Sequence, residues 1–175
     1  PPPAQSPPDG DAAGGAAGAP PGGKRREPRR DRRVTVGGVS ISSPDRIVYE
    51  ELGLTKLELA RYYEDIAPWM LPHVSRRPLT LVRCPEGRAK ECFYQKHVAA
   101  RFPEAVLRVP IEEQGGVATY AAIDSTAGLL SLVQMGVLEF HVWGSHAENV
   151  ENPDQIVFDL DPDTQLPFAR VADAA

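Results

Sequence analysis

Two aspartates, Asp159 and Asp161, carry the strongest chemical signal in the sequence. They follow the bulky apolar run at 156–158, which is typical of a strand, so we predict a strand over 155–160. Strand side chains two residues apart point to the same face, and adjacent carboxylates there repel each other unless a cation neutralises them. Hard divalent ions such as Mg²⁺ prefer oxygen ligands of this kind. Pro162 ends the strand, which places the pair at its carboxyl end, where sites open.

Four interpretations of this acidic pair compete. It is an acidic turn that ends a strand, a calcium loop, the nucleophile motif of a phosphatase, or a two-metal site for nucleotidyl transfer to a 3′-hydroxyl. The calcium loop fails because its sixth and twelfth positions require Gly and Glu and here hold Thr164 and Arg170. The phosphatase is disfavoured because Asp163 stands where that motif has Thr or Val. The acidic turn and the two-metal site stay open.

The composition is that of a folded chain. Of its 175 residues, 42% are hydrophobic and 25% are charged, which excludes disorder throughout, and no apolar run approaches the ~18 residues of a membrane span. Cys84 and Cys92 lack the close spacing of a zinc site and are too few for a disulfide framework, so we predict two reduced thiols in a cytosolic protein. Because the sequence starts at Pro1, without Met or a signal peptide, we expect it to be cut from a longer protein.

Residues 1–33 differ from the rest of the chain. They hold 8 of the 18 prolines and no Val, Ile, Leu or aromatic residue, so they have no apolar surface to offset the entropy of ordering. We predict a disordered linker rich in Pro, Gly and Ala. It carries seven Lys/Arg against four Asp/Glu, while residues 34–175 carry 12 against 20. This basic linker either attracts phosphates or only keeps the chain soluble.

From residue 34 onward the pattern predicts a packed α+β or α/β domain, of which we favour α+β. Thr55 and Glu58 have the spacing of a capping box, apolar residues follow at helical intervals, and we expect Pro68 to end this helix. A second helix is predicted over 126–135, capped by Ser125 and ended by Gly136. Strands are predicted over 34–41, with a bulge or hairpin at its two glycines, and over 79–83, 107–111, 117–123, 137–142 and 155–160.

Six motifs then occur in one order along the chain. They are GLTK at 53–56, RPLTLVRCP at 77–85, CFYQKH at 92–97, the helix at 129–136, HVWGS at 141–145 and VFDLDP at 157–162. Each is weak alone, but together they resemble the polymerase/primase domain of bacterial DNA ligase D, a member of the archaeo-eukaryotic primase superfamily. The resemblance implies a mixed sheet with flanking helices, of which residues 34–175 would form the N-terminal portion.

The resemblance also implies roles for individual residues. Asp159 and Asp161 match the metal-binding aspartates of the family's first catalytic motif, which Mn²⁺ or Mg²⁺ serves. His141 matches a histidine near the triphosphate of the incoming nucleotide. Phe93 and Tyr94 match an aromatic pair of which one stacks on the incoming base, a contact worth roughly 1–3 kcal/mol. Without the resemblance, His141 would be a strand-end histidine and the two aromatic residues part of the core.

Four basic residues are candidates for phosphate contacts. Lys96 lies two residues beyond Tyr94 and would meet a nucleotide phosphate. Arg46 and Lys56 match positions that, in this family, receive the 5′-phosphate of the downstream strand at a gap, and the N-terminus of the predicted helix would add its partial positive charge to Lys56. The alternative for these two is a pair of surface cations. Arg83 is a weaker candidate for a phosphate contact.

The function implied by the resemblance is nucleotidyl transfer to DNA 3′ ends, by gap filling or end extension in non-homologous end joining, with ribonucleotides preferred. The implied partners are DNA ends with a 5′-phosphate, NTP or dNTP, a fused or associated ligase module and an end-binding protein, in the bacterial cytoplasm at the nucleoid and without a membrane. Asp163 replaces the family's usual glycine, and its histidine motif and third catalytic carboxylate lie beyond Ala175. We therefore expect the segment alone to be inactive. The alternative is a non-catalytic fragment or remnant that binds DNA ends.

Overall fold

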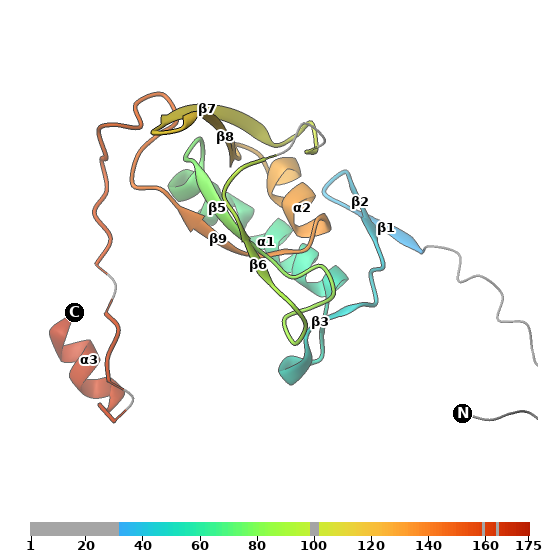
Figure 1. Ribbon diagram of the computed structural model, residues 1–175. Helices are drawn as coiled ribbons and strands as arrows, with labels where there is room; N and C mark the ends of the chain where they lie inside the picture. The colour runs from blue at the N-terminus through green and yellow to red at the C-terminus, as the bar shows by residue number, and fades with distance from the viewer. Residues whose placement is uncertain (1–31, 99–101, 159, 164) are drawn as a thin grey trace, which may run out of the picture. The chain divides into compact units, whose positions relative to one another are not determined.

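The structure is a computed structural model that describes residues 32–98, 102–158, 160–163 and 165–175. Its helical elements are η1 (Glu50–Leu52), α1 (Lys56–Val74), α2 (Thr126–Gln134) and α3 (Phe168–Ala174). Its strands are β1 (Arg33–Val36), β2 (Val39–Ser42), β3 (Ile47–Tyr49), β4 (Leu54–Thr55), β5 (Leu79–Arg83), β6 (Phe93–Gln95), β7 (Leu107–Glu113), β8 (Gly116–Ala122) and β9 (Val137–Val142) (Figure 1). The linker predicted at 1–33 lies, apart from its last two residues, outside the described residues.

Five of the strands form one antiparallel sheet, and β5 is its central strand. β9 pairs with one edge of β5 over 79–83, and β6 pairs with the other edge over 81–83. β8 joins β5 at Leu79 and forms a long hairpin with β7. Two small antiparallel pairs, β1–β2 and β3–β4, complete the strands. The α+β class with helices flanking a sheet is therefore confirmed. Every pairing between described strands is antiparallel, where the resemblance implied a mixed sheet. The glycines after Val36 form the turn of a hairpin.

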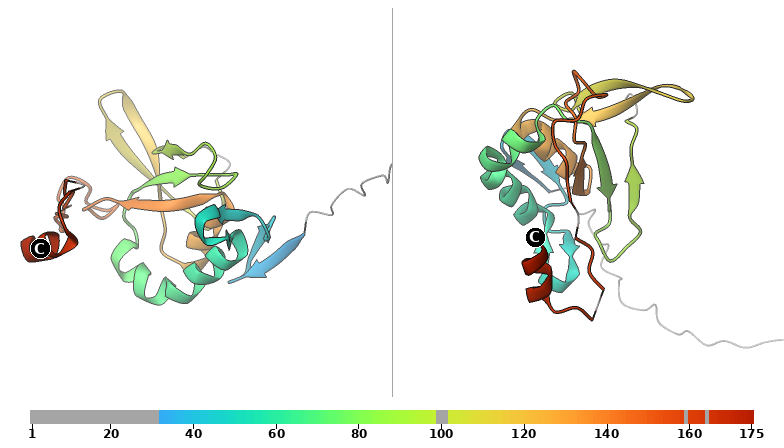
Figure 2. Two further views of the ribbon diagram at one scale, coloured as in Figure 1. Left: turned by 90° about the horizontal axis from the view of Figure 1, so that it is seen from below. Right: turned by 90° about the vertical axis from the view of Figure 1, so that its left-hand side faces the viewer.

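Helices α1 and α2 pack on one face of this sheet (Figure 2). Thr55 starts α1 with the predicted capping box, in which its hydroxyl accepts from the Glu58 N–H at 3.2 Å and the Glu58 carboxylate accepts from the Thr55 N–H at 2.8 Å. Ser125 starts α2, and its hydroxyl accepts from the Gly128 N–H at 3.2 Å. The main core joins apolar residues of both helices to strands β5, β8 and β9, among them Ala67, Leu79, Leu81, Ala121, Leu129, Leu132 and Val137.

Helix α1 continues through Pro68 to Val74, so the prediction that Pro68 ends it is wrong. Pro68 and Pro72 lie on the exposed side of the helix, where water can bond the carbonyls that lose an N–H partner. Ala67 and Val74, in contrast, are buried in the core. Packing of this apolar side holds the helix together across both prolines, and the helix curves along its length (Figure 2).

The strand predicted over 155–160 is also wrong, because residues 155–158 and 160 have no regular structure. Ile156, Val157 and Phe158 are 81%, 78% and 85% exposed. A strand exists through hydrogen bonds to a neighbouring strand, and no described strand pairs with this segment. Its β propensity therefore has no partner to act on. Among the described helices, none combines the length and apolar character needed to cross a bilayer.

Candidate functional site

Tyr94 and His141 come together on the face of the sheet opposite the helices. Leu81 of β5 and Phe140 of β9 point into the core beneath the helices, so their strand neighbours point the other way. Gln95 of β6 pairs with Leu81, so its neighbour Tyr94 points away from the helices. His141 follows Phe140 in β9 and points the same way as Tyr94. The two rings meet edge to face, with 5.9 Å between centroids and 62° between planes. Tyr94 is 70% exposed, so an aromatic surface is open beside an imidazole.

The structure separates Phe93 from Tyr94, because successive residues of a strand point to opposite faces. The Phe93 ring lies under the guanidinium of Arg83, with 5.4 Å between the Arg83 Cζ and the ring centroid. That guanidinium also donates to the Met135 carbonyl at the end of α2, at 2.9 and 3.2 Å, and to the Gln95 side chain at 2.9 Å. Burial lowers the pKa of Arg83. Its described contacts thus make Arg83 a cap for α2.

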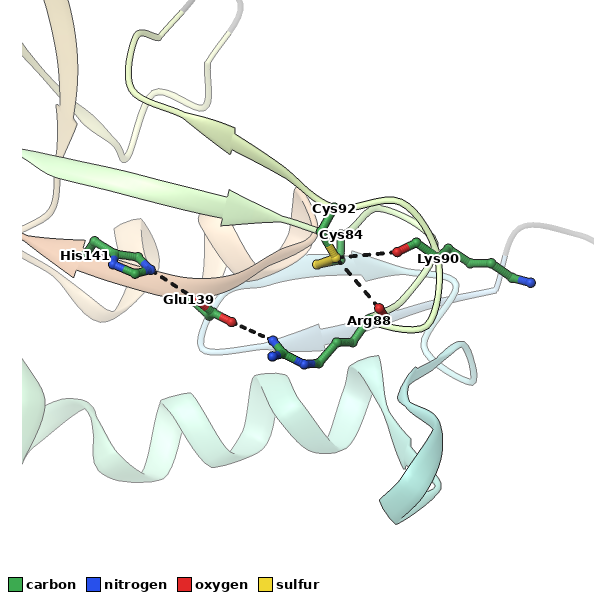
Figure 3. The surroundings of a disulfide bond; sticks show 6 residues. All are labelled: Cys84, Arg88, Lys90, Cys92, Glu139 and His141. Atoms are coloured by element: carbon green, nitrogen blue, oxygen red, sulfur yellow. Dashed lines mark hydrogen bonds and ion pairs between the residues drawn. A yellow bond between two sulfur atoms is a disulfide. The ribbon is translucent and has the colours of Figure 1, made fainter. Parts of the chain in front are cut away.

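Sequence reasoning missed Glu139, which binds His141 directly. The two residues lie on the same face of β9, and the His141 Nε2 is 3.1 Å from a Glu139 carboxylate oxygen. The other oxygen accepts from the Arg88 guanidinium at 2.5 Å (Figure 3). Donation by Arg88, and then by His141, lowers the pKa of Glu139. The Glu-x-His alternation within the predicted strand 137–142 was the available signal, since it places both side chains on one face.

Arg88 belongs to a loop that a disulfide closes. Cys84 and Cys92 are bonded, with 4.3 Å between their Cα atoms, so the prediction of two reduced thiols is wrong. The reason is the register of the β5–β6 hairpin, in which Arg83 pairs with Phe93 and the cysteines form the next cross-strand pair. In an antiparallel pair that shares no backbone hydrogen bonds, the two Cα atoms already stand about 4.5 Å apart. Figure 3 shows the loop, with Arg88 reaching from it towards β9.

Lys96 lies beyond the end of β6 and is exposed. The structure places it near Glu113, at the end of β7 in the β7–β8 hairpin. The Tyr120 hydroxyl and His97 lower the pKa of Glu113 most, and the charge of Lys96 adds a smaller effect. The described contacts thus associate Lys96 with this hairpin and do not bring it to the Tyr94–His141 pair.

Arg46 and Lys56 are brought together at one pocket of about 170 Å³. The Lys56 side chain is buried, at 7% exposure, and its ammonium donates to the Gln134 carbonyl at 2.7 Å and to the Gln134 side chain at 2.9 Å. The Arg46 guanidinium donates to the Pro85 carbonyl, and the Arg46 carbonyl accepts from the Lys56 N–H at 2.8 Å. Two cations thus share a concave surface at the C-terminal end of α2, whose carbonyls attract positive charge.

Residues 155–163, called the acidic segment below, follow an ion pair between the buried Arg77 and the half-exposed Asp154. Arg77, at 3% exposure, donates two hydrogen bonds of 2.7 Å to the Asp154 carboxylate, and His146 lies 3.1 Å from the same guanidinium. The Asp154 N–H also donates to the Gly144 carbonyl at 3.0 Å. Further on, Asp161 is exposed. Asp159 lies outside the described residues, among which no three His, Cys, Asp or Glu side chains are close enough together to hold a metal ion.

Comparisons with known proteins agree on one family. Residues 55–175 match the family model described as LigD, primase-polymerase domain. The multifunctional non-homologous end joining protein LigD of Pseudomonas aeruginosa is 37% identical over 142 residues, which are 81% of this chain and 17% of that protein. The protein of the same name from Mycolicibacterium smegmatis is 35% identical over 139 residues, which are 78% of this chain and 18% of that protein.

A solved structure matches as well. The polymerase domain of Mycobacterium tuberculosis Ligase D in complex with DNA superposes with a TM-score of 0.59 at 33% identity, over 62% of this chain and 38% of that one. The chain spans less than one fifth of the length of the two LigD proteins. With the matched fold and the ordered motifs, these similarities show that the chain belongs to the LigD primase-polymerase domain family.

Proposed function

We propose that this chain is part of an enzyme that transfers nucleotides to DNA 3′ ends during non-homologous end joining. Tyr94 would stack on the incoming base, and His141 would contact the triphosphate. By family resemblance alone, Lys96 would supply a further phosphate contact and Phe93 an alternative stacking surface, although the described contacts associate Lys96 with the β7–β8 hairpin and Phe93 with Arg83. The chain's membership of the LigD primase-polymerase family supports the reaction class.

The observation that carries this proposal is the Tyr94–His141 pair. A nucleotide needs an apolar ring surface for its base and a hydrogen-bond donor for its phosphates, within the length of one molecule. Tyr94 and His141 offer both groups side by side on an exposed sheet face. Base–aromatic stacking tolerates any base, which suits an enzyme that copies whatever template it meets.

The proposal assigns the metal to Asp159 and Asp161. Two carboxylates suit Mn²⁺ or Mg²⁺, which are hard ions that bind few protein oxygens together with substrate phosphates. Such ions activate a 3′-hydroxyl and stabilise the leaving pyrophosphate. The Arg77–Asp154 ion pair would hold the start of the acidic segment against the domain.

A second candidate function is binding of DNA ends without catalysis. The pocket between Arg46 and Lys56 favours it, because this pocket is built from the packed domain and does not depend on the acidic segment. A 5′-phosphate would meet the Arg46 guanidinium and the buried ammonium of Lys56. Local cationic groups position a nucleic acid backbone even where the net charge is negative.

The two candidates are separated by two binding measurements on the full 175-residue chain. The first compares affinity for gapped DNA with and without a 5′-phosphate, for the unchanged chain and for Arg46→Gln. We expect the phosphate to strengthen binding about tenfold, equivalent to one charge-assisted contact, and Arg46→Gln to abolish that difference. Equal affinity of the unchanged chain for both DNAs would remove the 5′-phosphate pocket.

The second measurement is a Mn²⁺ titration in the presence of a nucleoside triphosphate. Asp161→Asn should weaken Mn²⁺ binding, while Asp163→Asn, an exposed neighbour outside the proposed pair, should not. Identical isotherms for the unchanged chain and for Asp161→Asn would remove the metal assignment. Phosphate-dependent DNA binding in that case would leave the non-catalytic function as the supported one.

A further inference from the structure

We propose that Arg88 and Glu139 position the imidazole of His141, and that the Cys84–Cys92 disulfide fixes the loop from which Arg88 acts. This inference rests on the proposed function, in which His141 meets the triphosphate. Arg88 and Glu139 are positioning residues here, since they act through His141. The three side chains form one line from the disulfide loop to the exposed face of β9 (Figure 3).

The first step is the orientation of the ring. A carboxylate can only accept, so the His141 Nε2 that faces Glu139 at 3.1 Å carries the proton. This contact fixes which edge of the ring turns towards Glu139 and turns Nδ1 towards a ligand, to which Nδ1 donates when both ring nitrogens carry a proton. Tyr94 touches the same ring edge to face. An exposed histidine, whose side chain would otherwise sample several rotamers, is thereby held in one orientation.

The second step is charge. Glu139 stands two residues from His141 on the same strand face, so its negative charge would repel a triphosphate bound there. Arg88 cancels this charge at 2.5 Å, and its donation keeps the Glu139 carboxylate ionised by lowering its pKa. Glu139 can therefore orient the histidine without repelling the substrate. Arg88 makes the carboxylate compatible with an anionic ligand.

The third step is the support of Arg88 itself. The Cys84–Cys92 bond ties the two ends of its loop together. Within the loop the Gly87 N–H donates to the Cys84 carbonyl at 3.0 Å, and the Arg88 N–H donates to the Val48 carbonyl of β3 at 2.8 Å. These bonds fix the backbone from which the guanidinium extends. The disulfide is thus part of the support for His141.

The direct test is histidine side-chain NMR on the full chain without nucleotide. With ¹⁵N-labelled imidazoles, Glu139→Ala and Arg88→Ala should each shift the His141 nitrogen resonances and broaden them as the ring gains freedom, and Arg88→Lys should restore part of the signal. Glu148→Ala removes a matched surface carboxylate, which pairs with Arg76, and should leave His141 unchanged. Unaltered His141 resonances in Glu139→Ala overturn the proposal.

A second readout is the affinity for a nucleoside triphosphate with Mn²⁺. Arg88→Ala should weaken binding about tenfold when His141 is present and clearly less in a His141→Ala background, where only the repulsion by the uncompensated Glu139 remains, because coupled residues are not additive. An equal loss in both backgrounds would mean that Arg88 acts on the phosphates independently of His141 and would overturn the positioning role. If the unchanged chain binds no triphosphate, the proposed function fails, and the imidazole resonances alone decide on the positioning of His141.

Discussion

The ring of Tyr94 meets the ring of His141 edge to face across the open side of the sheet, with 5.9 Å between centroids. The two residues come from β6 and β9, which do not pair with each other but lie on either edge of β5. This contact distinguishes the two adjacent aromatic residues of β6, since Phe93 packs with Arg83 instead. It makes Tyr94 the better candidate for base stacking.

Tyr94→Ala should therefore weaken binding of a nucleoside triphosphate. Loss of one base–aromatic stack costs roughly 1–3 kcal/mol, or about fivefold to 150-fold in the dissociation constant, which fluorescence anisotropy of a labelled nucleotide measures. Tyr62→Ala, which removes an exposed tyrosine of α1, is the matched control and should bind normally. A loss in Phe93→Ala equal to that in Tyr94→Ala would contradict the distinction between the two.

Lys56→Gln should destabilise the fold as well as weaken any phosphate contact. The buried ammonium satisfies the Gln134 carbonyl at 2.7 Å, and an acceptor left without its donor costs about 1–3 kcal/mol. Urea unfolding followed by circular dichroism would measure this loss in the free energy of unfolding. Lys90→Gln changes an exposed lysine and should leave stability unchanged. Equal midpoints for both variants would show that the Lys56 contacts do not stabilise the fold.

The Arg77–Asp154 pair predicts a dependence of stability on pH. Donation by Arg77 lowers the pKa of Asp154, so the pair's contribution is full above the unfolded pKa of about 3.9 and is lost as pH falls through the folded pKa. Asp154→Asn should therefore be less stable than the unchanged chain at neutral pH, and the difference should shrink below about pH 4. Urea unfolding over a pH series measures this, and a difference that stays constant with pH would speak against the ion pair.

Loss of the Cys84–Cys92 bond should lower the free energy of unfolding. For a loop whose ends are separated by 8 positions, the chain-entropy relation gives about 2–3 kcal/mol. The Cys84→Ser/Cys92→Ser variant should show this loss in urea unfolding, and the unchanged chain in a dithiol reductant should match it. If the reductant does not alter the unchanged chain, the bond is absent from the folded protein in solution.

Gly37 and Gly38 offer a matched pair of substitutions in the β1–β2 turn. Both have positive φ, at 50° and 80°, but a Cβ on Gly37 would lie 2.5 Å from Leu130 in the core, whereas a Cβ on Gly38 meets nothing within 4 Å. Overpacking of this kind costs about 1–3 kcal/mol. Gly37→Ala should thus lower the thermal midpoint more than Gly38→Ala, and equal midpoints would show that the hairpin does not pack against α2.

Much of the fold could be predicted from local patterns. The capping box at Thr55, the serine cap at Ser125 and the strands at 79–83 and 137–142 all follow from interactions between residues close in sequence. The errors arose where distant residues decide. The end of α1 depends on which side of the helix faces the core, so Pro68 on the exposed side does not stop it. The disulfide depends on hairpin register, which spacing alone does not reveal.

In the candidate site, too, some residues could be predicted from the sequence and others depended on contacts between distant segments. Arg46 and Lys56 share one pocket, and Tyr94 contacts His141. Arg88 was missed because its contact with Glu139 arises only when the loop after β5 meets β9. Glu139 was missed although the alternation within 137–142 places it on the same face as His141. The prediction that 155–160 form a strand used β propensity alone, whereas a strand also needs a partner. Asp159 and Asp161 remain a prediction that rests on residue type and family.

The salt bridge between Arg77 and Asp154 fixes the start of the acidic segment to the domain. Asp161 lies seven residues beyond Asp154, and an extended chain covers at most about 3.6 Å per residue. The Asp161 backbone therefore lies within about 25 Å of Asp154. This radius bounds the volume in which Asp161, the proposed metal ligand, can lie. A longer linker inserted after Asp154 would enlarge that volume and lower the local concentration of the carboxylate.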